Sequence, residues 1–353
     1  MQMTTPPLQR RTLLKAGAAA ALGVPTLSVP AQTRITLKFH TFMSPTSYVW
    51  LNMHKPWMDK VERESGGRLR FEGYPAMQLG GSPAQLFDQA KDGIADIVWT
   101  LPGNTPGRFP RTEAFELPFI MSNAEATSKA LWAYIQTQAA DEYREVRPLA
   151  FQVHGPGLFH IKNRVIESPD DLRGLKVRGP TRQATKMLGY LGATPVGMPL
   201  PQIPDALSKG VIDGCVLPWE VVPSIRAHEL TGFHSEFDPA GGALYTNTFV
   251  MAMNLRRYNT LPDDLRRVID NNSGPATSGW LGKTQQAGDA PARKMAAERG
   301  NRIHTIGLAE SQEFRRRSRQ VEVEWVQDMD RRGFKGRELL DTARQLIQKH
   351  TQG

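Results

Sequence analysis

Residues capable of nucleophilic or metal chemistry are present in this chain, but their spacing matches no catalytic motif. His228-Glu229 begins a pattern like the zinc-protease HExxH, yet Gly232 occupies the place of the second histidine, and the next histidine is His234. Two histidines six residues apart lie on different faces of a helix and diverge from a common metal ion. The chain also has no GxSxG, GxxxxGK(S/T) or GxGxxG motif, the patterns of serine hydrolases, phosphate loops and dinucleotide sites. We therefore expect no enzyme activity, no metal and no cofactor.

The single cysteine and the charge balance narrow the class further. Cys215 is the only cysteine, so no internal disulfide is possible, and its apolar surroundings indicate a buried structural thiol rather than a nucleophile. The net charge of +9 falls to +6 without residues 1–31, which hold three basic and no acidic side chains. Basic and acidic residues are interleaved, as in Arg315 to Arg317 followed by Glu322. This pattern is typical of a solvated surface and not of a nucleic-acid-binding stripe.

The elements that must position the polar residues alternate between strand-like and helix-like segments. The first series is, in order, a strand at 35–41, a helix at 48–64, a strand at 69–74, a helix at 83–92 and a strand at 94–99. Apolar residues at helical spacing and the glycines that end each helix support these assignments. The β-α-β-α-β rhythm predicts a parallel, doubly wound sheet, and therefore an α/β fold.

A second series of elements begins near Leu149. Ser168 is a predicted helix N-cap, followed by acidic residues in the first turn. After Pro262 the chain is predicted to be almost wholly helical. Strands are predicted at 149–154, 158–162, 174–178, 212–217 and 245–254, with helices at 183–191 and 203–209. Because no linker separates the two series, we expect the chain to cross between two α/β lobes more than once.

The first 31 residues have the features of an export signal. Arg10 and Arg11 form a basic start without acidic neighbours, an apolar stretch follows from Leu13 to Val29, and Val29-Pro30-Ala31 supplies small residues for cleavage. Gln9 to Lys15 (QRRTLLK) resembles the twin-arginine signal, and an ordinary secretory signal is the alternative. No other apolar run approaches the roughly 18 residues that a membrane-spanning helix needs. We therefore predict a soluble periplasmic protein.

Four segments of the chain form an ordered set of motifs. The segments are YPAMQLGGSPAQLFDQAKDGIADI (Tyr74 to Ile97), FELPFIMSN (Phe115 to Asn123), SPDDLRGLKVRGP (Ser168 to Pro180) and LGATPVGMPLPQIPDALSKGVIDG (Leu191 to Gly214). Several motifs in the right order are much more specific than one. Together they resemble one protein family, the DctP-type solute-binding proteins of TRAP (tripartite ATP-independent periplasmic) transporters, and the resemblance extends from Ile35 to the C-terminus.

The resemblance implies the two-lobe periplasmic-binding-protein fold, with a hinge and a ligand cleft between the lobes. We expect lobe I at 32–153 plus about 244–283, and lobe II with the C-terminal helices at 154–243 plus about 284–353. It also implies that a small carboxylate ligand is delivered to the small and large membrane subunits of a transporter. An exported enzyme on the same scaffold, or a ligand-sensing protein that presents its closed form to a membrane receptor, are the alternatives.

In the family that it resembles, the arginine that closes the LKVRGP-like motif holds the ligand carboxylate, which here is Arg178. The local sequence supports this role, because Arg178 ends a strand just before Gly179-Pro180, where ligands gather in open α/β sheets. A guanidinium matches a carboxylate with two parallel hydrogen bonds. Each charge-assisted bond contributes about 1.5–3 kcal/mol net. A surface or structural ion pair is the alternative role.

The sequence departs from the sialic-acid-binding branch of that family at two polar positions. A second arginine, twenty positions before the first in those proteins, is replaced by Leu158, and the asparagine after the DG strand is replaced by Leu217. Trp219 lies nearby and either covers an aromatic ring or packs in the hinge core. Glu220 is a possible site for a co-bound cation, but no spacing requires one. The cleft is therefore expected to bind a smaller, flatter or more apolar acid, such as an aromatic or a 2-oxo or 2-hydroxy monocarboxylate.

Further candidates for the cleft follow or begin other strands. They are polar or aromatic residues at strand ends, where ligands contact open α/β sheets. They are Thr41, Phe42, Ser44, Trp99, Thr100, Asn104, Tyr245 and Asn247.

Overall fold

The computed structural model describes residues 2–3 and 34–352, and a compact unit begins at Arg34. Apart from residues 2–3, the predicted export signal lies outside the described residues. Within the described ranges, no helix is both long and apolar enough to cross a lipid bilayer.

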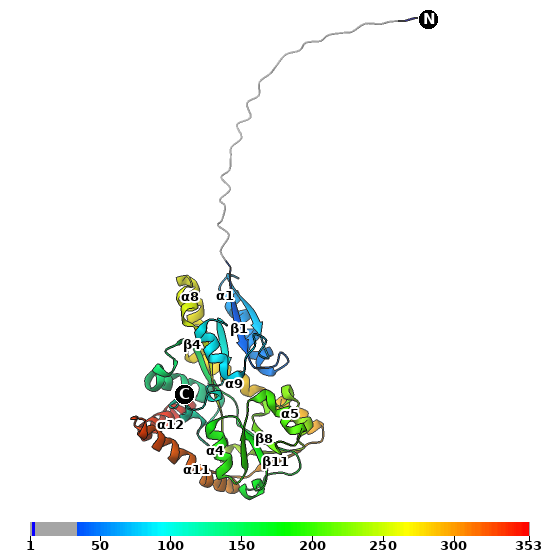
Figure 1. Cartoon of the computed structure of the whole chain (residues 1–353), viewed down its shortest axis with the longest axis vertical. Helices are drawn as coiled ribbons and strands as arrows, with labels where there is room; N and C mark the ends of the chain where they lie inside the picture. Colours follow the sequence, from blue (N-terminus) through cyan, green and yellow to red (C-terminus); the bar gives the residue numbers. More distant parts are fainter. Residues whose placement is uncertain (1, 4–33, 353) are drawn as a thin grey trace. The chain divides into compact units, whose positions relative to one another are not determined.

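The compact unit is built on two mixed β-sheets with helices packed around them (Figure 1). The first sheet has the strand order β2-β1-β3-β10-β4, and the second has the order β11-β9-β5-β8-β6-β7. The strands of the first sheet are β1 (Ile35–Thr41), β2 (Leu69–Tyr74), β3 (Ile97–Thr100), β4 (Val146–Val153) and β10 (Thr248–Asn254). Those of the second are β5 (Leu158–Ile161), β6 (Lys176–Gly179), β7 (Thr194–Gly197), β8 (Gly214–Leu217), β9 (Phe233–Phe237) and β11 (Arg302–Ile306).

The predicted parallel core of the first sheet is confirmed, because β1 pairs in parallel with both β2 and β3. The prediction was incomplete, however, since β10 runs antiparallel to both β3 and β4. The second sheet has the same feature, with β5 antiparallel to β8 and β9. The chain enters each of these antiparallel strands, β10 and β5, directly from the other sheet. They therefore lack the helical crossover that makes consecutive strands parallel.

The chain passes between the two sheets at three places in the described part. Residues 154–157 join β4 to β5, and residues 238–247 join β9 to β10. The third passage is at Gly288, between helices α9 and α10 and before β11. This repeated crossing agrees with the absence of a linker in the sequence. The residue limits given above for the two lobes stay a prediction.

Helices cover the sheets on their outer faces. Helices α3 and α9 pack on each other and on β4, α12 packs against α3, and α11 packs against α4. The longer helices are α1 (Lys55–Glu64), α2 (Leu86–Asp92), α3 (Ala124–Tyr134), α4 (Arg182–Tyr190), α8 (Asp263–Asn271), α9 (Pro275–Ala287), α10 (Asp289–Glu298), α11 (Leu308–Arg331) and α12 (Gly336–Gln352). The shorter ones are α5 (Ile203–Ser208), α6 (Ala227–Leu230) and α7 (Leu255–Asn259).

Serine hydroxyl groups of the covering helices accept hydrogen bonds from the backbone of the edge strand β4. The Val153 N–H donates to Ser128 Oγ of α3 at 3.0 Å, and the Phe151 N–H donates to Ser278 Oγ of α9 at 3.1 Å. An open strand edge would otherwise leave these backbone groups without partners. The two helices are therefore held close to the strand that leads into the other sheet.

Three strands were not predicted from the sequence, and one predicted helix is shorter. β7 contains a proline and a glycine, while β9 and β11 carry several polar residues, so none has the apolar pattern of a central strand. The Ser168 capping box is present, but the segment that it begins is only a short 3₁₀ turn, Pro169–Leu172. β10 begins at Thr248 rather than at Tyr245. β9 and β11 pair with strands that are distant in the sequence, whereas β7 pairs with β6, the strand that precedes it.

The close approach of α3 and α9 yields a stability prediction. A Cβ added at Gly282 would collide with the Ala124 carbonyl oxygen and the Ser128 hydroxyl of α3. We expect Gly282→Ala to lower the free energy of unfolding by about 1–3 kcal/mol, as measured by urea denaturation. Gly189→Ala in α4 is the matched control, because its Cβ would meet only Pro195 at 3.7 Å. That change should raise stability by about 0.5–1 kcal/mol, whereas a fully stable Gly282→Ala would contradict the close packing.

Candidate ligand-binding site

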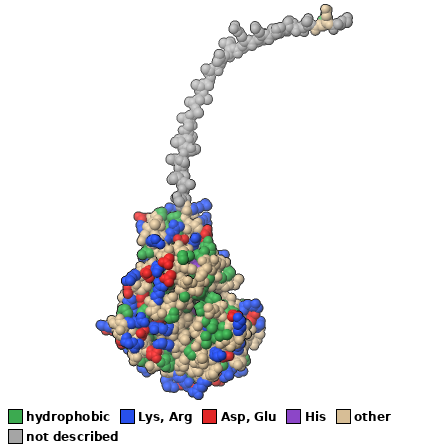
Figure 2. All heavy atoms as spheres, viewed as in Figure 1, with side chains coloured by type: hydrophobic (Ala, Val, Ile, Leu, Met, Phe, Trp, Pro, Cys, Tyr) green, Lys and Arg blue, Asp and Glu red, His purple; other side chains and the backbone are tan. Residues whose placement is uncertain are grey.

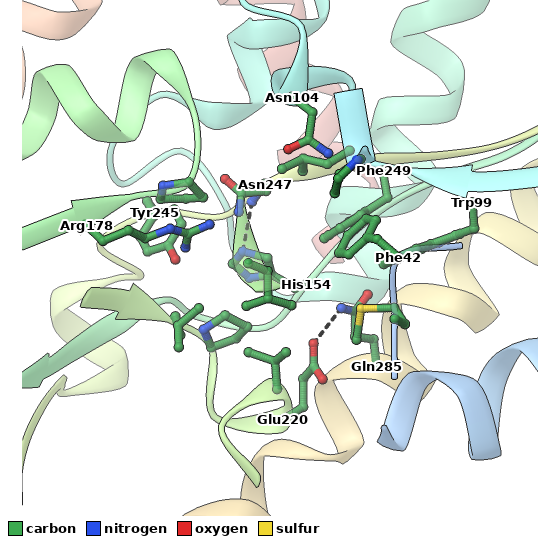
Figure 3. Close-up of a pocket in the computed structure, with 18 residues that line it drawn as sticks. Phe42, Trp99, Asn104, His154, Arg178, Glu220, Tyr245, Asn247, Phe249 and Gln285 are labelled. Atoms are coloured by element: carbon green, nitrogen blue, oxygen red, sulfur yellow. Dashed lines mark hydrogen bonds between the residues drawn. The ribbon is translucent and has the colours of Figure 1, made fainter. Parts of the chain in front are cut away.

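A cavity lies between the two sheets, at the carboxyl ends of their parallel strands (Figure 3). Strand ends and crossing segments from both sheets contribute to its wall. The lining residues are Phe42, Met43, Pro83, Trp99, Leu101, Asn104, His154, Arg178, Pro180, Leu200, Leu217, Pro218, Glu220, Val221, Tyr245, Asn247, Phe249 and Gln285.

Arg178 places a buried positive charge in this cavity. Its side chain is only 2% exposed, and its guanidinium points toward the middle of the enclosed space in Figure 3. Nε donates to the Met198 carbonyl at 2.9 Å and Nη1 to the Val216 carbonyl at 3.4 Å. In the described part of the chain, no Asp or Glu oxygen lies within 4.0 Å of it. Burial accordingly lowers the pKa of Arg178, since a charge removed from water is destabilised.

Two further polar groups lie beside Arg178 and are not used by the fold. The Tyr245 hydroxyl and Asn247 Oδ1 are buried and have no hydrogen-bond partner among the described residues. Asn247 is held through its backbone N–H, which donates to His154 Nε2 at 3.1 Å. His154 Nδ1 lies 2.5 Å from the Gly155 carbonyl, so this nitrogen carries the proton. An added Cβ at Gly157 would collide with the Tyr245 ring, so only glycine fits under it.

The groups around Arg178 do not bring a compensating negative charge. Burial, with a contribution from Arg178, lowers the pKa of His154 to about 4, so this ring is neutral at pH 7. Burial also raises the pKa of Tyr245 and raises that of Glu220 to about 8. At neutral pH the guanidinium is therefore the main charge that faces the cavity. An anionic group is the ligand chemistry that offsets its loss of hydration.

Aromatic rings form the opposite wall of the cavity. Trp99 and Phe249 are stacked, with ring centroids 4.3 Å apart and planes 10° from parallel. The Phe42 ring lies 5.6 Å from Trp99. Figure 3 shows these three rings across the cavity from the Arg178 guanidinium. The site therefore combines a cationic end from the second sheet with an aromatic face from the first.

Side chains of the two halves also contact each other directly, near Arg178 at the start of α4. Glu113 Oε2 accepts hydrogen bonds of 2.5 Å from both Arg182 Nη2 and Gln183 Nε2. Glu116, one helical turn away, accepts from the Thr248 N–H and hydroxyl at 3.2 and 2.8 Å. Burial, and secondarily the nearby Glu113, raises the pKa of Glu116 to about 7.

Eight of the residues predicted from the sequence line the same cavity. They are Phe42, Trp99, Asn104, Arg178, Leu217, Glu220, Tyr245 and Asn247. The five other candidates lie outside its lining. Thr41, Ser44 and Thr100 make local hydrogen bonds, Leu158 is buried opposite Leu217 in the second sheet, and Trp219 packs against His160 and His234.

Several lining residues were not predicted. His154 lies in a crossing segment, and Gln285 comes from helix α9. Phe249 lies in β10, two positions after Asn247 in the chain. The alternation of strand side chains could have indicated Phe249 once Asn247 was considered. His154 ends the strand predicted at 149–154, so the strand-end criterion could have indicated it, whereas no sequence pattern marks Gln285, which lies within helix α9.

The other chemically capable residues do not form a second site. Within residues 34–352 there is no cluster of three or more potential metal ligands. The His234 ring contacts His160 Nδ1 at 2.8 Å and Asn301 Nδ2 at 2.8 Å. Cys215 is buried as predicted, and burial raises its pKa to about 12. On the face seen in Figure 2, basic and acidic side chains are intermingled rather than gathered into one basic stripe.

Two α/β halves joined by several crossings, with a buried arginine in the cleft between them, define the class of periplasmic solute-binding receptors. Comparison with known proteins gives the family. The family model of the bacterial extracellular solute-binding proteins, family 7 (DctP), matches residues 39–328. This chain therefore belongs to that family, whose members bind solutes for transporters and are not enzymes. Membership also places the protein outside the cytoplasm.

Solved structures of TRAP solute-binding proteins support the assignment. One from Rhodoferax ferrireducens, with copurified benzoate, is 68% identical, with a TM-score of 0.90 over 90% of this chain and 99% of that one. A marine metagenome protein specific for aromatic acids, with 3-hydroxybenzoate, is 47% identical, with a TM-score of 0.88 and the same coverage. A Bordetella bronchiseptica protein with bound mandelate is 26% identical, with a TM-score of 0.81 over 89% and 99% of the two chains.

The raised pKa of Glu116 gives a pH-dependent prediction. A carboxyl whose pKa rises from 4.5 to about 7 on folding stabilises the protein fully below pH 4.5, and this contribution is lost as the pH rises to 7. Glu116→Gln keeps an acceptor but cannot ionise. We expect its stability relative to wild type to increase by about 2–3 kcal/mol between pH 5 and pH 8 in urea denaturation. The exposed Glu310→Gln is the control, and an equal difference at both pH values would contradict the prediction.

Proposed function

We propose that this protein captures an aromatic monocarboxylate of the benzoate class and delivers it to the membrane subunits of a TRAP transporter. The observation that carries the proposal is the Arg178 guanidinium, which is buried, has no carboxylate partner in the described chain, and faces three aromatic rings. One carboxylate on a flat apolar ring is complementary to both features. The benzoate and the 3-hydroxybenzoate bound to two of the relatives described above belong to this class.

The polar groups near Arg178 account for a single carboxylate. Two oxygens of a carboxylate match the fork of a guanidinium, and the free Tyr245 hydroxyl and the Asn247 amide add hydrogen-bonding groups at the same end. Each charge-assisted bond contributes about 1.5–3 kcal/mol. The rest of the lining is largely apolar, which disfavours a polyhydroxylated sugar acid, because its hydroxyl groups would lose water without finding partners.

Ligand capture is coupled to closure of the cleft in this proposal. Arg178 belongs to the second sheet, whereas Trp99 and Phe249 belong to the first. A ligand therefore contacts both halves only when they are closed, and it shifts the population toward that state. The closed form is then the signal that the small and large membrane subunits recognise.

Substitution of Arg178 tests the ligand assignment. We expect Arg178→Ala to weaken benzoate binding at least a hundredfold in titration calorimetry, since two charge-assisted bonds are lost. Arg178→Lys should also weaken it strongly, because an ammonium group lacks the bidentate geometry. Arg173→Ala is the matched control, because Arg173 is exposed on the turn before the same strand and should leave affinity unchanged.

The ligand panel includes benzoate, mandelate and a sugar acid. Saturation with a true ligand at one hundred times its dissociation constant adds about 2.7 kcal/mol to the stability of the wild type, which thermal unfolding detects. Unchanged benzoate affinity in Arg178→Ala would refute the role of this residue. A wild-type protein that binds the sugar acid but not benzoate would refute the ligand class.

The export route is a separate proposal. We propose that residues 1–31 direct the folded protein through the twin-arginine pathway, on the basis of Arg10 and Arg11 in the segment QRRTLLK. The double substitution Arg10→Lys, Arg11→Lys keeps the charge but removes the arginine pair, so the periplasmic protein should fall at least tenfold in cell fractionation. Arg34→Lys, beyond the signal, is the control. Undiminished export of the double variant would instead indicate the general secretory route.

A further inference from the structure

Glu220 brings a second polar group to the cavity, away from the cationic end. It lies in the short 3₁₀ turn Trp219–Val221 that follows β8 of the second sheet. Gln285, its partner, belongs to α9, which packs on β4 of the first sheet. Both side chains line the same cavity as Arg178 (Figure 3). The pair therefore joins the two halves of the protein at the wall of the ligand site.

A directed chain of hydrogen bonds fixes the orientation of the Glu220 carboxyl. Trp99 Nε1 donates to Gln152 Oε1 at 3.2 Å, Gln152 Nε2 donates to Gln285 Oε1 at 2.7 Å, and Gln285 Nε2 donates to Glu220 Oε1 at 2.6 Å. An indole nitrogen can only donate, so the direction of every later bond follows. Glu220 Oε1 is thus an acceptor.

The second carboxyl oxygen of Glu220 has no partner. Glu220 is only 3% exposed, and its buried Oε2 atom makes no hydrogen bond within the described chain. A buried polar atom without a partner destabilises the protein by about 1–3 kcal/mol. A ligand atom that bonds to this oxygen would remove the penalty. Because Oε1 already accepts from Gln285, Oε2 is the carboxyl oxygen that remains without a partner for a ligand.

Two acidic side chains, Glu220 and Asp289, lie at this end of the cavity, in place of the cation at the other end. Burial raises the pKa of Glu220 to about 8, and the neighbouring Asp289 adds to the effect. Asp289 Oδ1 accepts the Glu220 N–H at 2.9 Å, and burial raises the pKa of Asp289 to about 7. At neutral pH the Glu220 carboxyl largely keeps its proton, and two acidic groups lie side by side. A neutral hydroxyl is therefore favoured here and a second anion is not.

We propose that Glu220 forms a second polar subsite, which binds a hydroxyl group on the aromatic ring and excludes a second carboxylate. The inference rests on the proposed function, because it takes the carboxylate of the ligand to lie on Arg178. A hydroxybenzoate then spans the cavity, with its carboxylate at the cationic end, its ring against Trp99 and Phe249, and its hydroxyl at Glu220. Glu220 acts as a specificity-determining residue.

The affinities of related acids test this subsite in the wild-type protein. The probes are benzoate, 3-hydroxybenzoate, 4-hydroxybenzoate and isophthalate, measured by titration calorimetry at pH 7. We expect at least one hydroxybenzoate to bind about tenfold more tightly than benzoate, as one added hydrogen bond would produce. Isophthalate should bind at least tenfold more weakly than benzoate. If neither hydroxybenzoate is preferred, the subsite is refuted while the benzoate site stands.

Variants at Glu220 separate recognition from a role in closing the cleft. Glu220→Leu should weaken the hydroxybenzoate about tenfold more than it weakens benzoate and so lose the preference, whatever benzoate affinity is lost with the Gln285 bond. Glu220→Gln should keep the preference, because the amide can accept from Gln285 and donate to the ligand. Val221→Ala, which enlarges the same end of the cavity without changing a polar group, is the matched control and should alter both affinities equally.

The outcomes distinguish this inference from the proposed function. Equal weakening of benzoate and hydroxybenzoate in Glu220→Leu would mean that Glu220 only stabilises the closed form, and the subsite would be refuted. Loss of the preference, with the hydroxybenzoate weakened about tenfold more than benzoate, would support it. If wild-type protein binds neither benzoate nor a hydroxybenzoate, the proposed function itself fails and the subsite fails with it.

Discussion

The arrangement of the site follows from one constraint, a buried guanidinium that the fold leaves without a countercharge. Arg178 is anchored by two carbonyl groups, those of Met198 and Val216, which position it without neutralising it. Carbonyl dipoles offset only part of the lost hydration of a cation, and the remainder is several kcal/mol in a buried site. In the proposed function, the ligand carboxylate supplies what is missing. The parallel strands β8, β6 and β7 hold the arginine at one edge, so the anionic end of a ligand has a fixed position.

The titratable groups around Arg178 keep that charge uncompensated. His154 is neutral because burial lowers its pKa to about 4, and Glu220 largely retains its proton because burial raises its pKa to about 8. An ionised Glu220 would instead add a negative charge to the cavity wall and compete with the ligand carboxylate. The same desolvation that makes these groups neutral therefore preserves the attraction for one anion. Burial thus sets both the affinity and the charge of the ligand that the cleft accepts.

The sequence predicted the class, the cationic residue and most of the polar lining, because these lie at the ends of strands with clear patterns. Such strand ends hold or adjoin four of the lining residues, namely Phe42, Trp99, Arg178 and Asn247. His154, which ends the predicted strand at 149–154, meets the same criterion but was not selected, and Gln285 could not be found in this way because it lies within helix α9. The sequence left two alternatives for Trp219, a ligand contact or core packing. The structure places it against His160 and His234, outside the cavity lining. The edge strands β7 and β11 and the inner strand β9 escaped prediction because they lack the apolar pattern of a central strand, and the partners of β9 and β11 are also distant in the chain.

The hydrogen-bond chain from Trp99 to Glu220 connects the ligand ring to the closure of the cleft. Trp99, Gln152 and Gln285 all belong to elements of the first half, and only the last bond, from Gln285 to Glu220, crosses to the second. In the proposed function, opening of the cleft therefore breaks that bond and separates the Gln285 amide from the Glu220 carboxyl. A ring packed on Trp99 stabilises the first member of the chain, and a ligand that bridges the cleft protects the last bond from water. Since a buried amide–carboxyl bond gains strength when water is excluded, ligand contact at the aromatic wall and closure at Glu220 reinforce each other. The specificity of the site and its conformational response thus depend on the same side chains.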